Sequence, residues 1–215
     1  MPDPVDTESL KPGPDGRLRC WWCHAHDDYR EYHDREWGLP VAEDHRLFEK
    51  ICLEGFQSGL SWLTILRKRE NFRRAFRDFD FVRIARFTQR DVNRLLSDQG
   101  IIRHRGKIEA TINNASRAVA LVAEFGSLAA WVWQFEPSEE DVGLLESKSQ
   151  ACERTTCPEA VDLSKQLRKR GWKFVGPTTA YAFMQAMGMV NDHLKDCEFR
   201  RKVSNARNKF RRPIL

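Results

Sequence analysis

From Leu167 to Thr179 the chain reads LRKRGWKFVGPTT. The residues before this segment have apolar side chains at helical spacing, and its proline suits the first position of a following helix. Gly171 and Gly176 allow the backbone to turn sharply and to approach a ligand closely. The aromatic and apolar residues between the two glycines can anchor the turn in a core. The pattern predicts a helix, a tight turn and a second helix.

The start of the second helix predicts a phosphate contact. Free N–H groups at a helix N-terminus favour an anion. Arg170 and Lys173 flank this point, and Thr178 and Thr179 can donate hydrogen bonds there. An ordinary helical hairpin with a capping glycine has the same pattern, so these residues alone leave both interpretations open.

The rest of the chain has helical periodicity, and no convincing stretch alternates with period two. We expect helices in six segments, most of which have apolar residues at helical spacing: 42–53, 57–67, 91–97, 107–122, 161–170 and 178–189. We therefore expect an all-α fold with short connections. No internal repeat and no dinucleotide or P-loop motif is present.

The composition is that of a globular chain, with 215 residues of which 41% are hydrophobic. No apolar run approaches the roughly 18 residues that span a bilayer, and the polar N-terminus predicts no secretory signal. Six cysteines are too few for a disulfide scaffold, so we expect a cytoplasmic protein in which clustered Cys and His bind metal. Cys52 lies in an apolar stripe and is expected in the core.

Basic charge is concentrated toward the C-terminus. The net charge is +5, but residues 161–215 hold 13 Lys and Arg against 4 Asp and Glu, a net of +9, which leaves −4 for residues 1–160. Such a distribution indicates a polyanionic partner, although a solvated basic tail explains it equally well.

The chain divides by composition into three parts. We expect a disordered leader at residues 1–18, a domain of two helical lobes around a pocket at 19–197, and a mobile basic tail at 198–215. Within the domain, residues 136–159 hold seven acids and two bases, which predicts a surface loop.

Cys and His residues near both ends of the chain predict a metal site. His193 and Cys197 are four apart, a spacing that places both on one face of a helix. With Cys20 and His33 they make a Cys2His2 set, which suits a closed structural zinc site. A rival set uses the CxxC pair and a nearby histidine: Cys20, Cys23 and His24 or His26.

Four blocks of sequence resemble a known family. They read YHDREWG from Tyr32, ICLEGFQSGLSW from Ile51, GIIRHRGKI from Gly100 and VNDH from Val190. In this order, and with the hairpin, they are similar to the Tag family of 3-methyladenine DNA glycosylases, part of the helix-hairpin-helix glycosylase superfamily. The resemblance runs from residue 19 to 197. It implies a helical fold whose hairpin holds the DNA backbone without reading its sequence.

The resemblance also implies a structural Zn²⁺ that joins the two ends of the domain, and it favours the Cys2His2 set over the CxxC set. The implied ligands are Cys20, His33, His193 and Cys197.

The resemblance further implies a base pocket. A flipped base would stack on Trp62, between walls formed by Trp22, Tyr32 and Trp37, with Tyr29 nearby. Such rings are otherwise candidates for the core, but an aromatic cage suits a cationic base such as N3-methylated adenine.

Glu54 matches the base-recognising acid of the family. A buried carboxylate needs a partner, and an adenine amine with a positive ring supplies one.

The implied reaction is hydrolysis of the N-glycosidic bond of a flipped base. Asn191 stands where the superfamily usually has a catalytic aspartate, and Asp192 need not replace it. A cationic base leaves readily, so we expect Glu54 to assist electrostatically. No lysine stands in the nucleophile position, which predicts a monofunctional enzyme.

For DNA we expect Leu60 to act as a wedge that fills the gap left by the flipped base. The expected backbone contacts are Arg170, Gly171, Lys173, Gly176, Thr178 and Thr179. The expected partner is alkylated double-stranded DNA, bound by a cytoplasmic, nucleoid-associated monomer without membrane contact. The alternative is a non-catalytic, zinc-stabilised helix-hairpin-helix module that only binds DNA.

Overall fold

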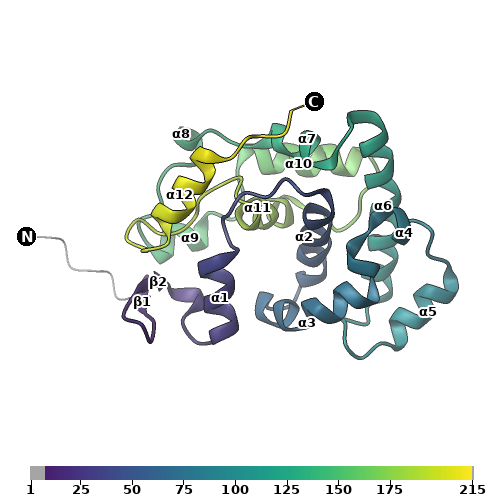
Figure 1. Cartoon of the computed structure of the whole chain (residues 1–215), viewed down its shortest axis with the longest axis horizontal. Coiled ribbons are helices and arrows are strands. Elements are labelled where there is room, and N and C mark those ends of the chain that lie inside the picture. Colours follow the sequence, from purple (N-terminus) through teal and green to yellow (C-terminus); the bar gives the residue numbers. More distant parts are fainter. Residues whose placement is uncertain (1–7, 215) are drawn as a thin grey trace, which may run out of the picture.

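The computed structural model describes residues 8–214 and is mostly helical (Figure 1). One antiparallel hairpin precedes the helices, with β1 at Leu10–Pro12 and β2 at Leu18–Cys20. The α-helices are α1 Asp27–Arg35, α2 Asp44–Gln57, α3 Trp62–Ala75, α4 Phe81–Ile84, α5 Gln89–Ser97, α6 Arg105–Phe125, α7 Leu128–Val132, α8 Glu139–Val142, α9 Lys148–Glu153, α10 Pro158–Lys169, α11 Pro177–Ala186 and α12 Arg200–Lys209. Short 3-10 helices are η1 Trp21–Cys23, η2 Arg77–Phe79 and η3 Trp133–Phe135.

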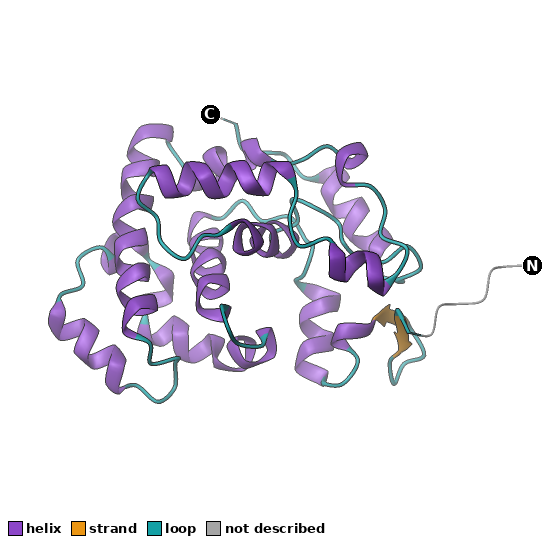
Figure 2. Cartoon of the chain, turned by 180° about the vertical axis from the view of Figure 1, so that it is seen from behind, coloured by secondary structure: helices purple, strands orange, loops and turns teal. Residues whose placement is uncertain are grey.

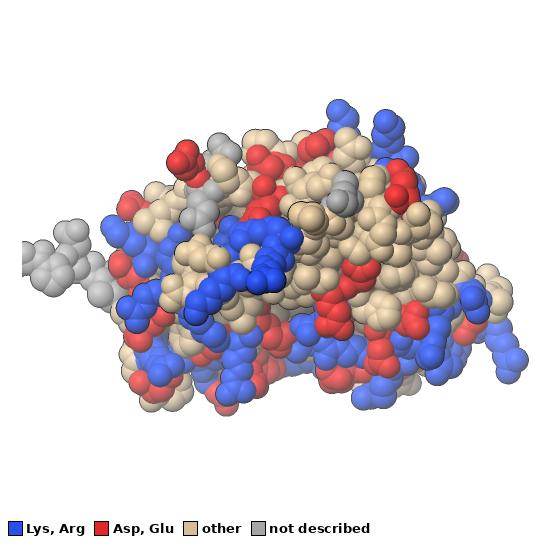
Figure 3. Space-filling view, turned by 45° about the horizontal axis from the view of Figure 1, so that its top comes forward, with Lys and Arg blue, Asp and Glu red and all other residues tan. Residues whose placement is uncertain are grey.

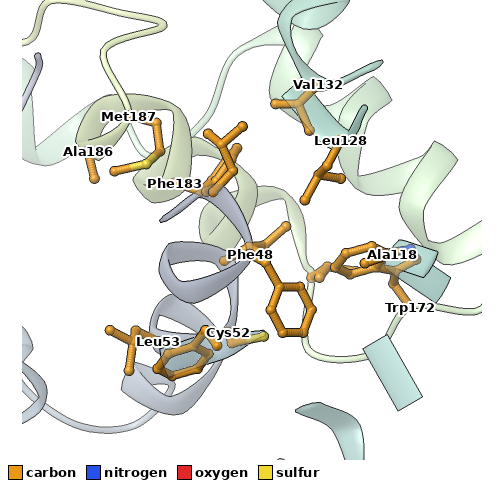
Figure 4. Packing of buried hydrophobic residues seen from close by; sticks show 14 of the residues in the cluster. Phe48, Cys52, Leu53, Ala118, Leu128, Val132, Trp172, Phe183, Ala186 and Met187 are labelled. Atoms are coloured by element: carbon orange, nitrogen blue, oxygen red, sulfur yellow. The ribbon is translucent and has the colours of Figure 1, made fainter. Parts of the chain in front are cut away.

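Helix α2 lies at the centre of the molecule, with other helices around it (Figure 1). Its buried face carries Phe48 and Cys52, which are spaced one helical turn apart and point into the cluster shown in Figure 4. Trp172, from the turn after α10, packs edge-on against Phe48 with ring centroids 6.1 Å apart. The expectation that Cys52 is a core residue is therefore confirmed.

The helix, turn and second helix expected at residues 167–179 are present as α10, a turn and α11. Gly171 has a φ of +83°, a left-handed conformation that glycine adopts without strain, and a proline occupies the first position of α11. Helix α6 holds the turn, because the Asn114 side chain bonds both the N–H and the C=O of Lys173, each at 2.9 Å. Asn113 donates to the Gly171 carbonyl at 2.8 Å.

The N-terminal expectation was wrong for part of the leader. Residues 1–7 lie outside the described residues, but Leu10 pairs with Cys20 across the hairpin and is 4% exposed. Three-residue strands are too short to show alternation in sequence, which is why periodicity missed them.

The basic tail also has a defined structure. Residues 200–209 form α12, in which Val203 and Arg207 are buried. Asn191 donates to Ser204 of this helix at 2.9 Å, and Arg207 pairs with Glu136 at 3.1 Å. The expectation of a mobile tail from residue 198 onward is therefore wrong for α12, because its few apolar and paired side chains pack against the preceding segments.

The acidic segment 136–159 is only partly a loop. It contains α8 and α9, and α10 begins at Pro158. Ser147 caps α9 by accepting a hydrogen bond from the Gln150 N–H at 3.3 Å.

Charge on the face shown in Figure 3 is mixed, with basic and acidic side chains interspersed. In the described part of the chain, no single helix is long and apolar enough to cross a membrane; α6 with the following α7–η3 segment meets the length and composition criteria only as a pair bent by 85°.

Candidate active site and metal cluster

Four Cys and His side chains from distant parts of the chain meet in one buried cluster. Their ligand atoms all lie within 4.8 Å of one another, and the residues are Cys20, His33, His193 and Cys197. Cys20 ends β2, His33 lies in α1, and the other two lie in the segment between α11 and α12. Figure 2 shows the β-hairpin beside α1 at one end of the molecule.

Three of the four ligand atoms lie at separations close to those of a tetrahedral zinc site. His33 Nε2 lies 3.1 Å from His193 Nδ1, and Cys197 Sγ lies 3.6 Å and 3.5 Å from these two atoms. Ligand atoms at the usual zinc bond lengths in tetrahedral geometry are separated by about 3.3–3.8 Å. These three separations are close to that range, Cys20 Sγ lies within 4.8 Å of the other ligand atoms, and a Cys2His2 donor set suits zinc.

The remaining ring nitrogens of both histidines have hydrogen-bond acceptors that hold the rings in place. The Asp34 carboxylate accepts from His33 Nδ1 at 2.8 Å, and the Trp37 carbonyl accepts from His193 Nε2 at 3.2 Å. Arg19 in turn binds Asp34 through two nitrogens, at 3.0 and 2.8 Å. Such outer contacts fix the tautomer and orientation of ligating histidines.

The rival CxxC set is not assembled. Cys23 is buried, but its thiol donates to the Cys20 carbonyl at 3.2 Å, and His24 and His26 are exposed. The expectation that His193 and Cys197 lie on one face of a helix was also wrong. Residues 193–197 form a non-helical turn that brings both side chains to the cluster.

A pocket lies beside this cluster. Its walls include all the aromatic residues expected there, together with Glu54: Trp22, Tyr29, Tyr32, Trp37 and Trp62. Trp22 is central, with ring centroids 4.9 Å from Tyr29 and 5.0 Å from Trp37, while Tyr32 lies 5.5 Å from Trp62.

The metal cluster and the pocket share a wall. The Trp22 ring lies 5.2 Å from the His33 ring, and the Trp37 ring lies 4.7 Å from the His193 ring. The position of these two pocket walls therefore depends on the segments that the cluster joins.

Glu54 is 6% exposed and lies one helical turn after Lys50 on α2, with 3.6 Å between Glu54 Oε1 and Lys50 Nζ. Burial raises the pKa of Glu54, and Lys50 opposes that rise. Burial also lowers the pKa of Lys50 to about 8, against the attraction of Glu54. Glu54 thus lines the pocket as one member of a desolvated ion pair with Lys50.

The sequence did not predict the role of Lys50 as the partner of Glu54. It also did not predict three polar side chains that line the pocket: Gln57, Gln185 and Asp192. The signal for Lys50 was its position, four residues before Glu54 and between apolar residues of one helix. Asp192 is held by Tyr181, which donates at 2.7 Å, and by Gln185 at 2.8 Å. Asn191 bonds the Arg200 carbonyl at 3.2 Å as well as Ser204, and is not among the lining residues.

Leu60 lies in the short connection between α2 and α3 and is 41% exposed. Its neighbour Gly59 has a φ of +80°, which allows the tight bend. Lys107 of α6 anchors the connection by donating to the carbonyls of Phe56 and Ser58, at 2.8 and 2.5 Å. An exposed leucine is thus presented on a held loop next to Trp62.

The expected phosphate contacts differ in availability. Lys173 and Thr178 are exposed, and the backbone turns at Gly171 and Gly176. Arg170, however, pairs with Glu124 through both terminal nitrogens, with one contact at 3.0 Å and the other at 2.5 Å. Thr179 is partly exposed in the first turn of α11.

Aromatic walls, a buried carboxylate and a nearby exposed leucine define a pocket for a flat, electron-poor ring, of the kind used by enzymes that act on bases turned out of a duplex. Residues 22–201 match a family model described as methyladenine glycosylase. The chain belongs to the methyladenine glycosylase family.

Curated relatives match over most of the chain. It is 47% identical over 179 residues to DNA-3-methyladenine glycosylase 1 of Escherichia coli (strain K12), covering 83% of this chain and 95% of that protein. It is 45% identical over 182 residues to DNA-3-methyladenine glycosylase of Haemophilus influenzae (strain ATCC 51907 / DSM 11121 / KW20 / Rd), covering 83% and 96%.

Solved structures agree with the helical fold. A crystal structure of 3-methyladenine DNA glycosylase I superposes with a TM-score of 0.78 at 47% identity, covering 84% of this chain and 98% of that one. A Staphylococcus aureus structure concerned with 3-methyladenine recognition superposes with a TM-score of 0.75 at 35% identity, covering 82% and 93%.

Proposed function

We propose that this protein is a monofunctional DNA glycosylase that excises 3-methyladenine from alkylated double-stranded DNA, as a cytoplasmic monomer. The observation that carries the proposal is the buried carboxylate of Glu54 in an aromatic pocket. Within a family of methyladenine glycosylases, this combination suits a flat ring that carries positive charge.

In the proposed complex the flipped base stacks on Trp62, and Trp22, Tyr32 and Trp37 enclose it. Glu54 accepts from the exocyclic amine and attracts the positive ring. Tyr29 supports Trp22, against which it packs in the structure. A neutral base gains less from the carboxylate and from the ring faces, so binding itself selects the methylated base.

The chemistry needs little acid catalysis, because the base is already cationic while it is joined to the sugar and leaves as a neutral molecule. Bond cleavage leaves positive charge on the sugar, and water adds to it with loss of a proton. Glu54 stabilises the positive charge in the pocket electrostatically. The side chain of Asn191 bonds Arg200 and Ser204, which supports a reaction without the usual superfamily carboxylate at this position.

We propose that the Cys2His2 cluster holds a structural Zn²⁺. A closed set of four protein ligands leaves no position for a substrate, so its effect is on folding. Bound there, the ion joins the β-hairpin and α1 to the segment after α11, and so holds the walls that carry Trp22 and Trp37.

We propose that the α10–α11 hairpin is a helix-hairpin-helix element that binds the DNA backbone. Gly176 brings the main-chain N–H groups at the start of α11 close to a phosphate, with Gly171, Lys173, Thr178 and Thr179 around it. Arg170 is a weaker candidate than its sequence position suggested, because Glu124 already pairs with it. Leu60 fills the space of the flipped base.

The test is chromatography of bases released from methylated DNA by the native protein and by Glu54→Gln. The native protein should release 3-methyladenine, and the variant should lose about 10- to 150-fold in kcat/KM, the equivalent of one lost hydrogen bond to a charged group. Glu49→Gln is the matched control, since Glu49 is also buried on α2 but pairs with Arg73 at 2.7 Å. A folded, DNA-binding native protein that releases no base would leave the non-catalytic module as the explanation.

A further inference from the structure

The ammonium of Lys50 already lies against side chains that line the base pocket. Its Nζ lies 3.7 Å from the centre of the Trp62 ring and 4.6 Å from that of Tyr32. It also donates to the Tyr32 hydroxyl at 2.6 Å and lies 3.6 Å from Glu54. Three of the side chains proposed to bind a cationic base, Trp62, Tyr32 and Glu54, therefore also stabilise Lys50.

Lys50 is not among the lining residues of the base pocket. It lines a second, smaller cavity, and Tyr32 faces both spaces. Six titratable or charged groups from α2, α3 and the end of α1 line this cavity or act on the charge of Lys50: Tyr32, Glu36, Arg46, Glu49, Glu54 and Arg69. On the α11 side the neighbours are the apolar Ala186 and Met187.

A cationic base would bring a second positive charge to this group. Like charges in a desolvated site repel strongly, and a cation whose pKa is low can relieve the repulsion by losing a proton. Lys50 can do so, because burial already lowers its pKa to about 8. The neutral amine would keep its contact with Tyr32, since the phenol O–H can then donate to the amine nitrogen.

We propose that Lys50 is a specificity-determining positioning residue that releases its proton to solvent when a cationic base enters the pocket, so that Glu54 changes partner from Lys50 to the base. This inference rests on the proposed base pocket. A neutral purine leaves the Lys50–Glu54 pair intact and gains nothing from the carboxylate charge.

The exchange also favours product release. Hydrolysis leaves 3-methyladenine neutral, and a neutral base no longer repels the protonated lysine. Lys50 takes up a proton from solvent and pairs with Glu54 again, which removes the charge that held the base.

The experiment is an NMR titration of protein labelled with ¹³C at the lysine Cε, a signal that shifts when the amine loses its proton. The probes are 3,9-dimethyladeninium, a base with a permanent positive charge, and neutral 9-methyladenine. Lys50→Met identifies the signal by its loss, and Lys50→Arg does so independently if the methionine variant does not fold.

Saturation with the cationic probe should lower the pKa of Lys50 by about one unit or more, equivalent to about a tenfold change in proton affinity, and the neutral probe should leave the pKa nearly unchanged. An unchanged or raised pKa with the cation bound overturns the inference. Failure of the cation to bind at all overturns the pocket itself, and the inference with it. Lys50→Arg, which cannot release its proton, should bind the cation at least about tenfold more weakly than the native protein.

Discussion

Replacing Asp34 by alanine tests the metal cluster without removing a ligand. The carboxylate of Asp34 accepts from His33 Nδ1 at 2.8 Å and from Arg19 at 3.0 and 2.8 Å. The substitution leaves all four proposed zinc ligands in place. It removes only the group that orients one of them.

The expected losses of zinc affinity and of folding stability in Asp34→Ala follow from these contacts. Loss of such an outer partner costs about 10- to 100-fold in metal affinity, or about 1.4–2.8 kcal/mol. Arg19, whose side chain is 6% exposed, keeps Asp15, at 2.7 and 2.8 Å, and the Arg17 carbonyl, at 3.0 Å. One lost charged hydrogen bond of this kind costs a further ~1.5–3 kcal/mol of folding stability.

The assay is competition for zinc with a chelator of known affinity, together with denaturant unfolding of the zinc-loaded protein. The matched control is Asp28→Ala on the same helix, where Asp28 pairs with Arg67 at 2.7 Å on the surface. That change should leave zinc affinity unaltered and cost under about 1 kcal/mol. Native zinc affinity in a folded Asp34→Ala protein would refute the assignment of His33 as a ligand oriented by Asp34.

Three further results are expected. Leu60→Ala should slow base release from duplex DNA but not from single-stranded DNA. Val119→Ala, a control at another exposed apolar residue, should slow neither reaction. Equal slowing on both substrates by Leu60→Ala would exclude a wedge. Lys173→Ala should reduce the slope of log DNA affinity against log salt by about 0.9. Arg170→Ala should change this slope less, because Glu124 already neutralises Arg170. A larger change for Arg170→Ala would contradict the assignment of Lys173 as the main phosphate contact. Burial raises the pKa of Glu36, but hydrogen bonds from Arg69 outweigh burial and hold this pKa below its usual range. The ionised Glu36 therefore stabilises the fold above the pKa that it has in the unfolded chain. This stabilisation is lost as the pH falls through the pKa of Glu36 in the folded protein. Urea unfolding of Glu36→Gln should therefore show a smaller decrease between about pH 5 and pH 3 than the native protein, and an equal decrease would assign the acid sensitivity elsewhere.

Local pattern predicted the long elements well and the short ones badly. The helix expected at 107–122 is observed as α6, Arg105–Phe125, because a long amphipathic repeat averages over its exceptions. Residues 10–20 and α12 were missed because each depends on partners far away in sequence. Leu10 is buried against a second cluster with Leu194, and α12 packs beside Asn191.

The helical class, the hairpin, the family resemblance and the residue types of the site could all be predicted from the sequence. These follow from periodicity, glycine placement and ordered blocks of residues, all of which are local properties of the chain. Even the Cys2His2 set was found with an incorrect local premise, since His193 and Cys197 meet in a turn and not on a helix.

Which charges act together is apparent only in the folded chain. Arg170 meets Glu124 from a helix 46 residues earlier in the chain, and Lys50 lies against Trp62 of the next helix. The physical reason is burial. A lysine or a carboxylate is ordinary in sequence, and its protonation and partners change only when folding removes it from water and places other charges beside it.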